Sequence, residues 1–419
     1  MRVTPGPLCH NKKMSSALPP AVDSSAQTIV ETEREYLFQN YARYPLTLAR
    51  GKGCHVYDLE GKRYLDFITG IGVNALGHAH PRIVKVIRDQ AAQLIHTSNL
   101  YYHPYQGPLA KRLAEMSGLA RAFFCNSGTE AIEGAIKIAH SHGRGISPEK
   151  FEIVALENSF HGRTIGALSI TGQPKYRADF EPLMPGVKFV PANDVAALEA
   201  AVGNNTAAIV MELIQGEGGV NPLTPEFVAK ARALADRHNA LLVADETQCG
   251  VGRPGTYFAY QRSTPVILPD VMVAAKPVAC GLPLGFIMAN EKAHAAIRPG
   301  MHGTTFGGNA LACRVALEFC EMLPELLPQI ERVGGYFHVS LNEVARKHSV
   351  IKEVRGFGLM LGVELAVPGK QLVLDAMAEG LLINCTHDTV LRMLPPYIIG
   401  EKEVDQAVKI LSKLIGKLK

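Results

Sequence analysis

Runs of apolar residues separated by helical patterns characterise the middle of the chain. One helical pattern is marked at its start, with Thr224 as N-cap and Pro225 in the first turn. The apolar runs suit parallel strands buried on both faces, and they lie at residues 123–125, 153–156, 207–211, 240–244 and 271–274. This alternation predicts an α/β fold with a large, doubly wound, mostly parallel sheet. Ligands of such sheets bind beyond the carboxyl ends of the strands.

The two ends of the chain predict a second, smaller α+β domain. On the N-terminal side we expect a helix at 31–41 and a β meander with strands at 47–50, 54–58 and 63–67. On the C-terminal side we expect helices at 310–327, 330–345 and 401–418, with a hairpin at 354–364. The resulting division is a disordered tail at 1–30, an N-terminal part of the small domain at 31–70, a large α/β domain at 71–312 and a C-terminal small domain at 313–419.

Composition restricts the class of protein. Of 419 residues, 47% are hydrophobic and the net charge is only +4, which gives no case for nucleic acid or a membrane surface as partner. No apolar run reaches the roughly 18 residues of a spanning helix. The eight cysteines contain no Cys-x-x-Cys pair, which argues against a metal site or a disulfide framework and favours a reducing compartment. We expect a cytoplasmic protein; an organelle transit peptide containing Arg2, Lys12 and Lys13 is the alternative.

Lys276 is the first candidate for chemistry, because it follows the apolar run 271–274 and precedes Pro277. Burial disfavours a charged lysine, lowers its pKa and makes the neutral amine a better nucleophile, as Schiff-base chemistry requires. The glycine-containing segment 280–285 can let a flat ligand come close. The alternative is a lysine whose head group returns to solvent.

Three other strand ends carry polar residues. Ser127, Gly128 and Thr129 precede a helix, where free N–H groups and hydroxyls bind phosphate; the alternative is a capping box. Farther along, Phe160 could stack on a planar ring and Arg163 could hold a carboxylate, or both belong to an exposed loop. Buried Asp245 needs a cationic partner, which a protonated pyridine nitrogen or an internal salt bridge would supply. Together these are the parts that pyridoxal phosphate requires.

The chain resembles the class III (ω-amino-acid) aminotransferases of the pyridoxal-phosphate fold type I superfamily. The resemblance covers roughly residues 35–415 and implies that the large domain binds the cofactor. Its motifs are Phe124-Cys125-Asn126-Ser127-Gly128-Thr129-Glu130-Ala131, Phe160-His161-Gly162-Arg163-Thr164, Gln215-Gly216-Glu217-Gly218-Gly219, Asp245-Glu246-Thr247-Gln248, Ala275-Lys276 and His302-Gly303-Thr304-Thr305-Phe306-Gly307-Gly308-Asn309.

The resemblance implies roles for these residues. Lys276 would bond to pyridoxal 5'-phosphate and move the proton, while Asp245 would keep the ring nitrogen protonated. Phe160 would stack on the ring and Gln248 would lie near its hydroxyl. The phosphate would be bound by Ser127, Gly128 and Thr129, and by Thr305 of the neighbouring subunit, which implies a homodimer with shared active sites. The implied substrate-binding residues are Arg163, Glu217, Thr304 and Arg392.

The implied reaction moves the δ-amino group of N-acetylornithine to 2-oxoglutarate. Alternatives are succinylornithine, succinyldiaminopimelate, ornithine or 4-aminobutyrate as amino donor, or a catalytically dead regulatory relative. Ornithine-specific relatives place a tyrosine at the position of Ile71, so isoleucine favours an acylated ornithine. Glu217 occupies the family's position for a gate over Arg392; the alternative is an ordinary structural ion pair. No strand is followed by Gly-x-Gly-x-x-Gly, which argues against nicotinamide binding.

Overall fold

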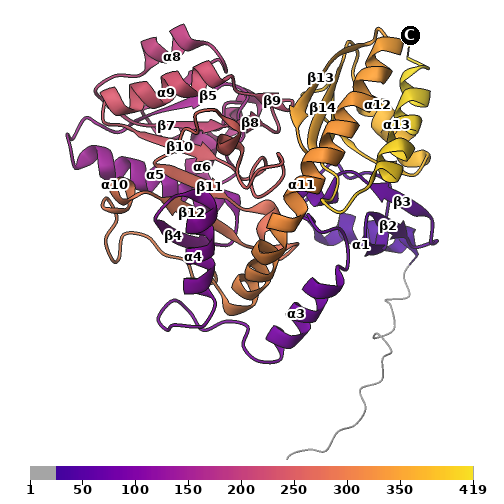
Figure 1. Ribbon diagram of the computed structural model, residues 1–419, viewed down its shortest axis with the longest axis horizontal. Coiled ribbons are helices and arrows are strands. Elements are labelled where there is room, and N and C mark those ends of the chain that lie inside the picture. Colours follow the sequence, from indigo (N-terminus) through magenta and orange to yellow (C-terminus); the bar gives the residue numbers. More distant parts are fainter. Residues whose placement is uncertain (1–24, 419) are drawn as a thin grey trace, which may run out of the picture.

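A seven-stranded sheet forms the centre of the larger lobe in the computed structural model, which describes residues 25–418 (Figure 1). Only β12 runs antiparallel to its neighbours, so the expected mostly parallel sheet is confirmed. The strands, in spatial order, are β4 (Arg121–Cys125), β12 (Gly285–Ala289), β11 (Val271–Ala274), β10 (Leu241–Asp245), β7 (Thr206–Glu212), β5 (Glu152–Leu156) and β6 (Val187–Val190).

Both faces of this sheet are covered, which explains the near-continuous apolar runs. Val154 and Leu242 belong to one apolar cluster, whereas their neighbours Ile153 and Leu241 belong to another. The first cluster includes α8 (Val195–Ala201) and α9 (Pro225–Arg237), and the second includes α5 (Gly128–Arg144) and α6 (Ile165–Ser169). Alternate strand residues therefore point to opposite helical layers, as in a doubly wound fold.

Shorter elements complete the larger lobe. The helices are α3 (Pro81–Ala91), α4 (Gln106–Ser117), α7 (Pro174–Arg177) and α10 (Glu291–His294), with 3-10 turns η1 (Ala178–Phe180), η2 (Ala259–Arg262) and η3 (Lys276–Ala279). A two-stranded sheet pairs β8 (Ile214–Gln215) with β9 (Asn221–Pro222). The expected N-cap of α9 is confirmed, because the Thr224 side chain accepts a hydrogen bond from Phe227 N.

The smaller lobe is built from both ends of the chain. The meander β1 (Leu48–Lys52), β2 (His55–Asp58) and β3 (Arg63–Asp66) is extended by β15 (Leu381–Leu382), which pairs with β3 in parallel. A second sheet has the order β13-β14-β17-β16 and contains the expected hairpin. Its strands and the lobe's helices are β13 (Ile351–Phe357), β14 (Met360–Leu365), β16 (Asn384–Thr386), β17 (Val390–Met393), α1 (Ala26–Tyr36), α2 (Thr69–Gly72), α12 (Lys370–Ala378) and α13 (Glu401–Ile415).

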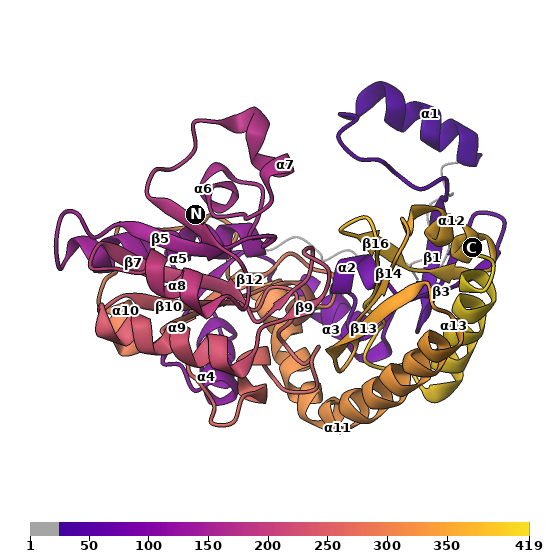
Figure 2. The same cartoon turned by 90° about the horizontal axis from the view of Figure 1, so that it is seen from above.

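Two expectations about helices are wrong. Residues 310–345 form one helix, α11 (Ala310–Lys347), that continues through Pro324 and Pro328 and runs beneath both lobes (Figure 2). The proposed domain boundary at 312–313 therefore falls inside a helix. Helix α1 begins at Ala26, so the last five residues of the expected disordered tail are helical. Residues 1–24, with Arg2, Lys12 and Lys13, lie outside the described residues.

Among residues 25–418, no helix is long and apolar enough to cross a membrane.

Candidate active site

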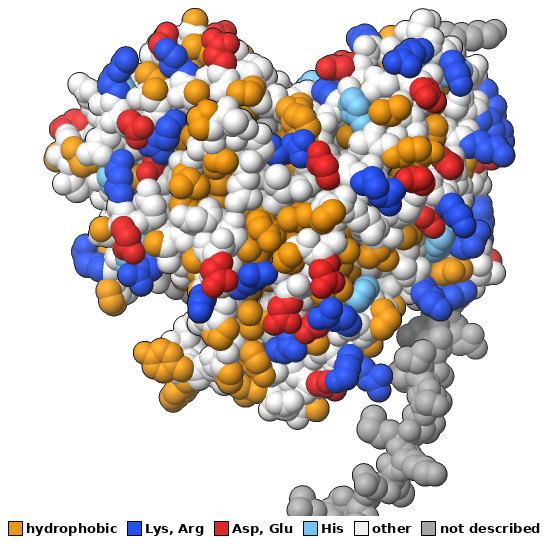
Figure 3. Space-filling view, in the orientation of Figure 1, with side chains coloured by type: hydrophobic (Ala, Val, Ile, Leu, Met, Phe, Trp, Pro, Cys, Tyr) orange, Lys and Arg blue, Asp and Glu red, His pale blue; other side chains and the backbone are white. Residues whose placement is uncertain are grey.

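The carboxyl ends of β4, β5, β10 and β11 open onto one cavity of about 370 Å³. Its lining comes mainly from the larger lobe, with Val73 after α2 contributed by the smaller lobe; the notch between the two lobes is visible in Figure 3. Most predicted site residues line this cavity: Ser127, Gly128, Thr129, Phe160, Arg163, Glu217, Asp245, Gln248 and Lys276. The sequence rule that ligands bind beyond parallel strand ends thus brings together residues that are far apart in the chain.

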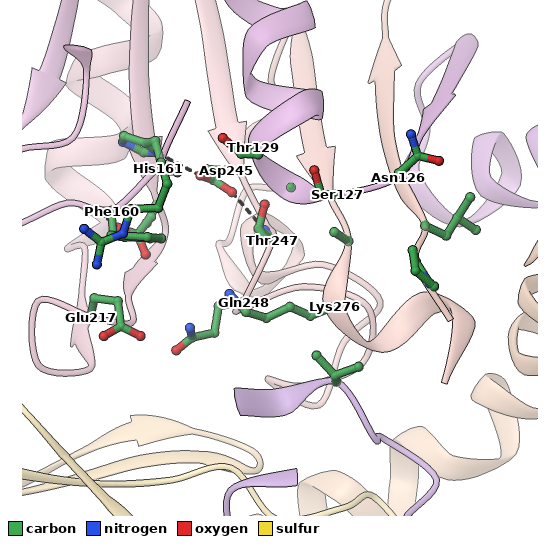
Figure 4. A pocket seen from close by; sticks show the side chains of 18 of the residues that line it. Asn126, Ser127, Thr129, Phe160, His161, Glu217, Asp245, Thr247, Gln248 and Lys276 are labelled. Atoms are coloured by element: carbon green, nitrogen blue, oxygen red, sulfur yellow. Dashed lines mark hydrogen bonds and ion pairs between the residues drawn. The ribbon is translucent and has the colours of Figure 1, made fainter. Parts of the chain in front are cut away.

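Lys276 follows β11 and opens the 3-10 turn η3, where Pro277 occupies the first turn. Its side chain extends into the cavity toward Gln248 (Figure 4), not to the outer surface. Burial lowers the pKa of the Lys276 amine below its ordinary value. The described residues place no carboxylate within ion-pair distance of it. The amine is therefore favourably placed to react in its neutral form.

Ser127, Gly128 and Thr129 form the start of α5, whose first-turn N–H groups have no intrahelical acceptors. Ser127 Oγ accepts a hydrogen bond from Glu130 N at 3.3 Å, so the capping role is present. Gly162 packs against this turn with φ +143°, and a Cβ there would lie 2.2 Å from Thr129 Oγ1. Only glycine lets the loop close onto the helix N-terminus, which is a suitable site for a phosphate group.

Asp245 is buried at the end of β10 and is held by two donors. His161 Nδ1 lies 2.7 Å from Asp245 Oδ2, and Thr247 N donates to Asp245 Oδ1 at 2.9 Å (Figure 4). Burial alone would lower the pKa of His161, but the hydrogen bond and charge of Asp245 raise it overall. No role could be predicted for His161 from its motif, because its contact with Asp245 depends on the strand order.

Glu212, at the end of β7, is another buried carboxylate that was not predicted. It accepts hydrogen bonds from Phe160 N and Gly216 N, both at 2.9 Å. Burial raises the pKa of Glu212 to about 7. By anchoring two loops at once, Glu212 positions Phe160 on one side of the cavity and the segment before Glu217 on the other.

The residues around the cavity fit pyridoxal phosphate. Thr247 Oγ1 is buried and has no hydrogen-bond partner among the described residues, so a ligand atom can satisfy it. The α5 N-terminus suits the phosphate, Asp245 suits a cationic ring nitrogen and Lys276 suits a covalent link. Hydrogen-bond donors, a carboxylate and an amine, all of the types that pyridoxal phosphate requires, thus line one cavity.

Arg163 lies on the loop after β5 and has no carboxylate within ion-pair distance among residues 25–418. Its guanidinium carbon lies 4.1 Å from the ring centroid of Tyr176 and 5.5 Å from that of Phe160. The two rings meet edge to face at 5.9 Å. Arg163 is therefore held by aromatic faces at the cavity wall and keeps its hydrogen-bond donors available for an anion.

Arg392, on β17, lies behind the cavity wall and is only 1% exposed. Its Nη1 lies 2.6 Å from Glu217 Oε1 and 2.8 Å from Gln248 Oε1, and its Nε donates to Asn384 at 3.2 Å. Burial opposes ionisation of Glu217, but Arg392 holds its pKa below the ordinary value. The predicted Glu217–Arg392 contact is therefore present, and Gln248, expected near the ring hydroxyl, also contacts Arg392.

Besides Arg392, two predicted site residues, Thr304 and Thr305, do not line the cavity of their own chain. Thr304 Oγ1 accepts hydrogen bonds from Asn126 Nδ2 at 3.1 Å and Gly307 N at 3.2 Å, next to the phosphate-type turn. Thr305 is exposed. Ile71 is 43% exposed and has φ +63°, which is strained for a β-branched residue.

Comparison with known proteins agrees with this geometry. The Aminotransferase class-III family model matches residues 36–415. The acetylornithine aminotransferase of Methanocaldococcus jannaschii is 46% identical over 94% of this chain and 100% of its own length. Among solved structures, the ornithine aminotransferase of Toxoplasma gondii has a TM-score of 0.89 at 34% identity, covering 94% of this chain and 95% of its own. The acetylornithine aminotransferase of Elizabethkingia anophelis has a TM-score of 0.83 at 31% identity, covering 94% and 100%.

Fold and site together define a pyridoxal-phosphate-dependent transaminase of fold type I. Within that class, the chain belongs to the class III aminotransferase family, whose cofactor is pyridoxal 5'-phosphate. The resemblance inferred from the motifs is therefore confirmed.

Proposed function

We propose that this enzyme transfers the δ-amino group of N-acetylornithine to 2-oxoglutarate in arginine biosynthesis. The products are N-acetylglutamate semialdehyde and glutamate. The observation that carries the proposal is a single site that combines the half-buried Lys276, Arg163 on the cavity wall with no ion-pair partner among the described residues, and a second arginine, Arg392, whose charge is neutralised by Glu217. Relatives named acetylornithine aminotransferase, at 46% and 45% identity, support this choice of substrate.

The proposed site uses the chain's own residues in distinct ways. Bound pyridoxal phosphate supplies an electron sink for the substrate carbon that loses its proton. Lys276 attaches the cofactor and carries the proton, because its lowered pKa provides a neutral amine as base. Asp245, fixed by His161 and Thr247, provides the negative charge that stabilises a protonated ring nitrogen. The residues that would hold the cofactor are Ser127, Gly128, Thr129, Phe160, Asp245, Gln248 and Lys276, with Thr305 from a second copy.

Two arginines let one site accept two substrates. N-acetylornithine reacts at the end far from its carboxylate, so that carboxylate is held away from Lys276 by Arg163. Glutamate and 2-oxoglutarate react next to a carboxylate and require Arg392. While the first substrate is bound, Glu217 neutralises Arg392 through the 2.6 Å contact. Thr304 is the remaining proposed substrate-binding residue; it lies outside the lining of its own chain's cavity and is hydrogen-bonded to the lining residue Asn126.

Ornithine is the second candidate amino donor, because the Toxoplasma gondii structure is an ornithine aminotransferase. Ile71 favours the acylated substrate, since an aliphatic side chain offers no hydrogen-bond partner for a free α-amine. Steady-state kcat/KM values for N-acetylornithine, N-succinylornithine, succinyldiaminopimelate, ornithine and 4-aminobutyrate, with 2-oxoglutarate as acceptor, test the proposal. A higher kcat/KM for any donor other than N-acetylornithine would overturn it.

We also propose a homodimer with shared active sites. The loop between α3 and α4 exposes large apolar side chains at the lower edge of the larger lobe (Figure 3). This loop contacts the 304–308 segment through hydrogen bonds from Asn99 to Thr304 O and Gly307 O. A second copy would cover this surface and receive Thr305. The apolar side chains concerned are Ile95, Leu100, Tyr101, Tyr102 and Phe306.

Subunit mixing tests the shared site. Lys276→Ala and Thr305→Ala chains are each expected to be inactive or weak alone. In a mixed dimer, one site combines the intact lysine of one chain with the intact threonine of the other, so about a quarter of all sites regain activity. No recovery after mixing, although differently tagged chains copurify as mixed dimers, would place Thr305 outside the partner's site.

A cytoplasmic location completes the proposal. The seven cysteines that the described part of the chain contains are all free, which is typical of a reducing compartment. Fractionation of cells that express the tagged protein checks this location.

A further inference from the structure

Tyr176 is an aromatic residue next to the site, and packing alone does not explain its position. It lies on the short helix α7, is only half-buried and stands against the Arg163 guanidinium at 4.1 Å. A second cation, Lys175 Nζ, lies 5.1 Å from the same ring. A cation over the face of a tyrosine is attracted by the ring quadrupole, so this contact directs Arg163 as well as packing it.

The segment that carries Tyr176 is anchored on both sides. Before it, the buried Gln173 side chain donates to the backbone oxygens of Asn158 and Ser159 at 3.3 and 3.4 Å. After it, the Arg177 guanidinium stacks on Phe189 at 4.2 Å. The ring of Tyr176 is therefore a fixed surface, whereas Arg163 is a long side chain that would otherwise populate many rotamers.

We propose that Tyr176 is a positioning residue that fixes where the carboxylate of the ω-amino substrate binds. The inference rests on the proposed function, in which Arg163 binds that carboxylate. Phe160 and Tyr176 contact the guanidinium from the aromatic side, so its remaining N–H donors point to the substrate. Together they set the distance between the carboxylate and Lys276, and thereby the chain length of the substrate. Without Tyr176, the Arg163 side chain would sample many rotamers in the free enzyme. Substrate binding would then have to fix one of them, and this loss of side-chain entropy would weaken binding.

A pair of substrates isolates this effect. N-acetylornithine and N-acetylputrescine share the acetyl group and the reacting amine, but only the first has a carboxylate. For Tyr176→Leu we expect the KM for N-acetylornithine to rise about tenfold with kcat within about twofold. The kcat/KM for N-acetylputrescine should stay unchanged. Tyr176→Phe keeps the aromatic face and should restore the wild-type KM.

Two controls separate positioning from structure. Phe180→Leu removes an exposed aromatic side chain of the same segment that lies against no cation among the described residues, so the kinetics with both substrates should not change. In an Arg163→Ala background, Tyr176→Leu should add no further rise in KM, because the group that it positions is gone. Melting temperatures of the holoenzymes show whether each variant is folded.

The outcomes distinguish the inference from the function on which it rests. Equal losses for both substrates, a loss confined to kcat, or an undiminished effect in the Arg163→Ala background would overturn the role of Tyr176. Failure of the wild-type enzyme to use N-acetylornithine would overturn the proposed function. In that case the same variants are compared on the preferred amino donor and its decarboxylated analogue, which still tests Tyr176.

Discussion

Removing the negative charge of Glu217 should change the rates of the two half-reactions of this enzyme in different ways. In Glu217→Gln the side chain keeps its size but Arg392, 1% exposed, retains only the neutral partners Gln248 and Asn384. An uncompensated buried arginine attracts any carboxylate that can reach it. We therefore expect glutamate to react faster as amino donor, while the N-acetylornithine half-reaction slows or stays level.

The magnitude follows from the geometry. Breaking a fully buried ion pair costs about 3–5 kcal/mol, but the Glu217 side chain is 24% exposed, so water recovers part of this. About 1.4–2.8 kcal/mol of extra attraction for the α-carboxylate corresponds to a roughly 10- to 100-fold gain for glutamate. Arg392→Ala removes the charged contact itself, so the 2-oxoglutarate half should fall by about 100-fold or more while the ω-amine half is spared.

Single-turnover absorbance measurements on each half-reaction provide the assay. The ion pair Arg232–Asp270, at 2.8 Å and outside the cavity lining, supplies a matched control. Arg232→Met should lower the stability of the fold without changing the rate of one half-reaction relative to the other. Arg392 lowers the pKa of Glu217, so Glu217 stays ionised across about pH 6 to 9 and a change of pH in this range cannot mimic the substitution. Equal losses in both halves for Glu217→Gln and Arg392→Ala would refute the gate and leave a structural ion pair.

Three further outcomes are expected. In Asp245→Asn, the transamination rate should fall at least tenfold, because an amide cannot stabilise a pyridinium. The pKa of His161 is raised in the folded protein, so its pairing with Asp245 stabilises the fold below about pH 6.5 and this stabilisation is lost as pH rises through the folded pKa. The difference in melting temperature between the wild-type and variant apoproteins should therefore shrink with increasing pH. Ile71→Tyr should lower the ratio of kcat/KM for N-acetylornithine over ornithine about tenfold or more, and an unchanged ratio would remove Ile71 as a determinant. Lys150→Met should lose about 2–4 kcal/mol of unfolding free energy in urea with kcat unchanged, because Lys150 Nζ donates to Asn204 O, Thr206 O and His238 O at 3.0, 2.6 and 2.7 Å; a loss below about 1 kcal/mol would contradict this account.

Much of the site could be predicted from sequence because the fold itself gathers it. Lys276, Asp245, Phe160 and Ser127 each follow an apolar run, and parallel strands bring their carboxyl ends to one edge. The contact between His161 and Asp245 could not be predicted in this way. It depends on the strand order, in which only β7 separates β5 from β10, and local sequence patterns do not encode strand order.

The errors in the fold have similar causes. Two helices, 310–327 and 330–345, were expected where the structure has one, and the single helix contains Pro324 and Pro328, although proline in a helix interior costs about 3 kcal/mol. Helix α11 packs on α3 and α4 in one lobe and on β13 and α13 in the other, and this tertiary packing keeps it continuous. Strand β6 was missed because it lies at an edge and mixes polar with apolar positions.

The parallel pairing of β3 with β15 also determines when the smaller lobe can form during synthesis. Leu65 leaves the ribosome long before Leu381, its partner in the sheet. At roughly 5–20 residues per second, translation of the intervening chain lasts on the order of tens of seconds. During that time one edge of β3 has no partner, while all strands of the larger sheet, β4 to β12, are made before Leu381 emerges. The N-terminal meander is thus the part of the nascent chain that waits longest, and the one whose protection by chaperones matters most.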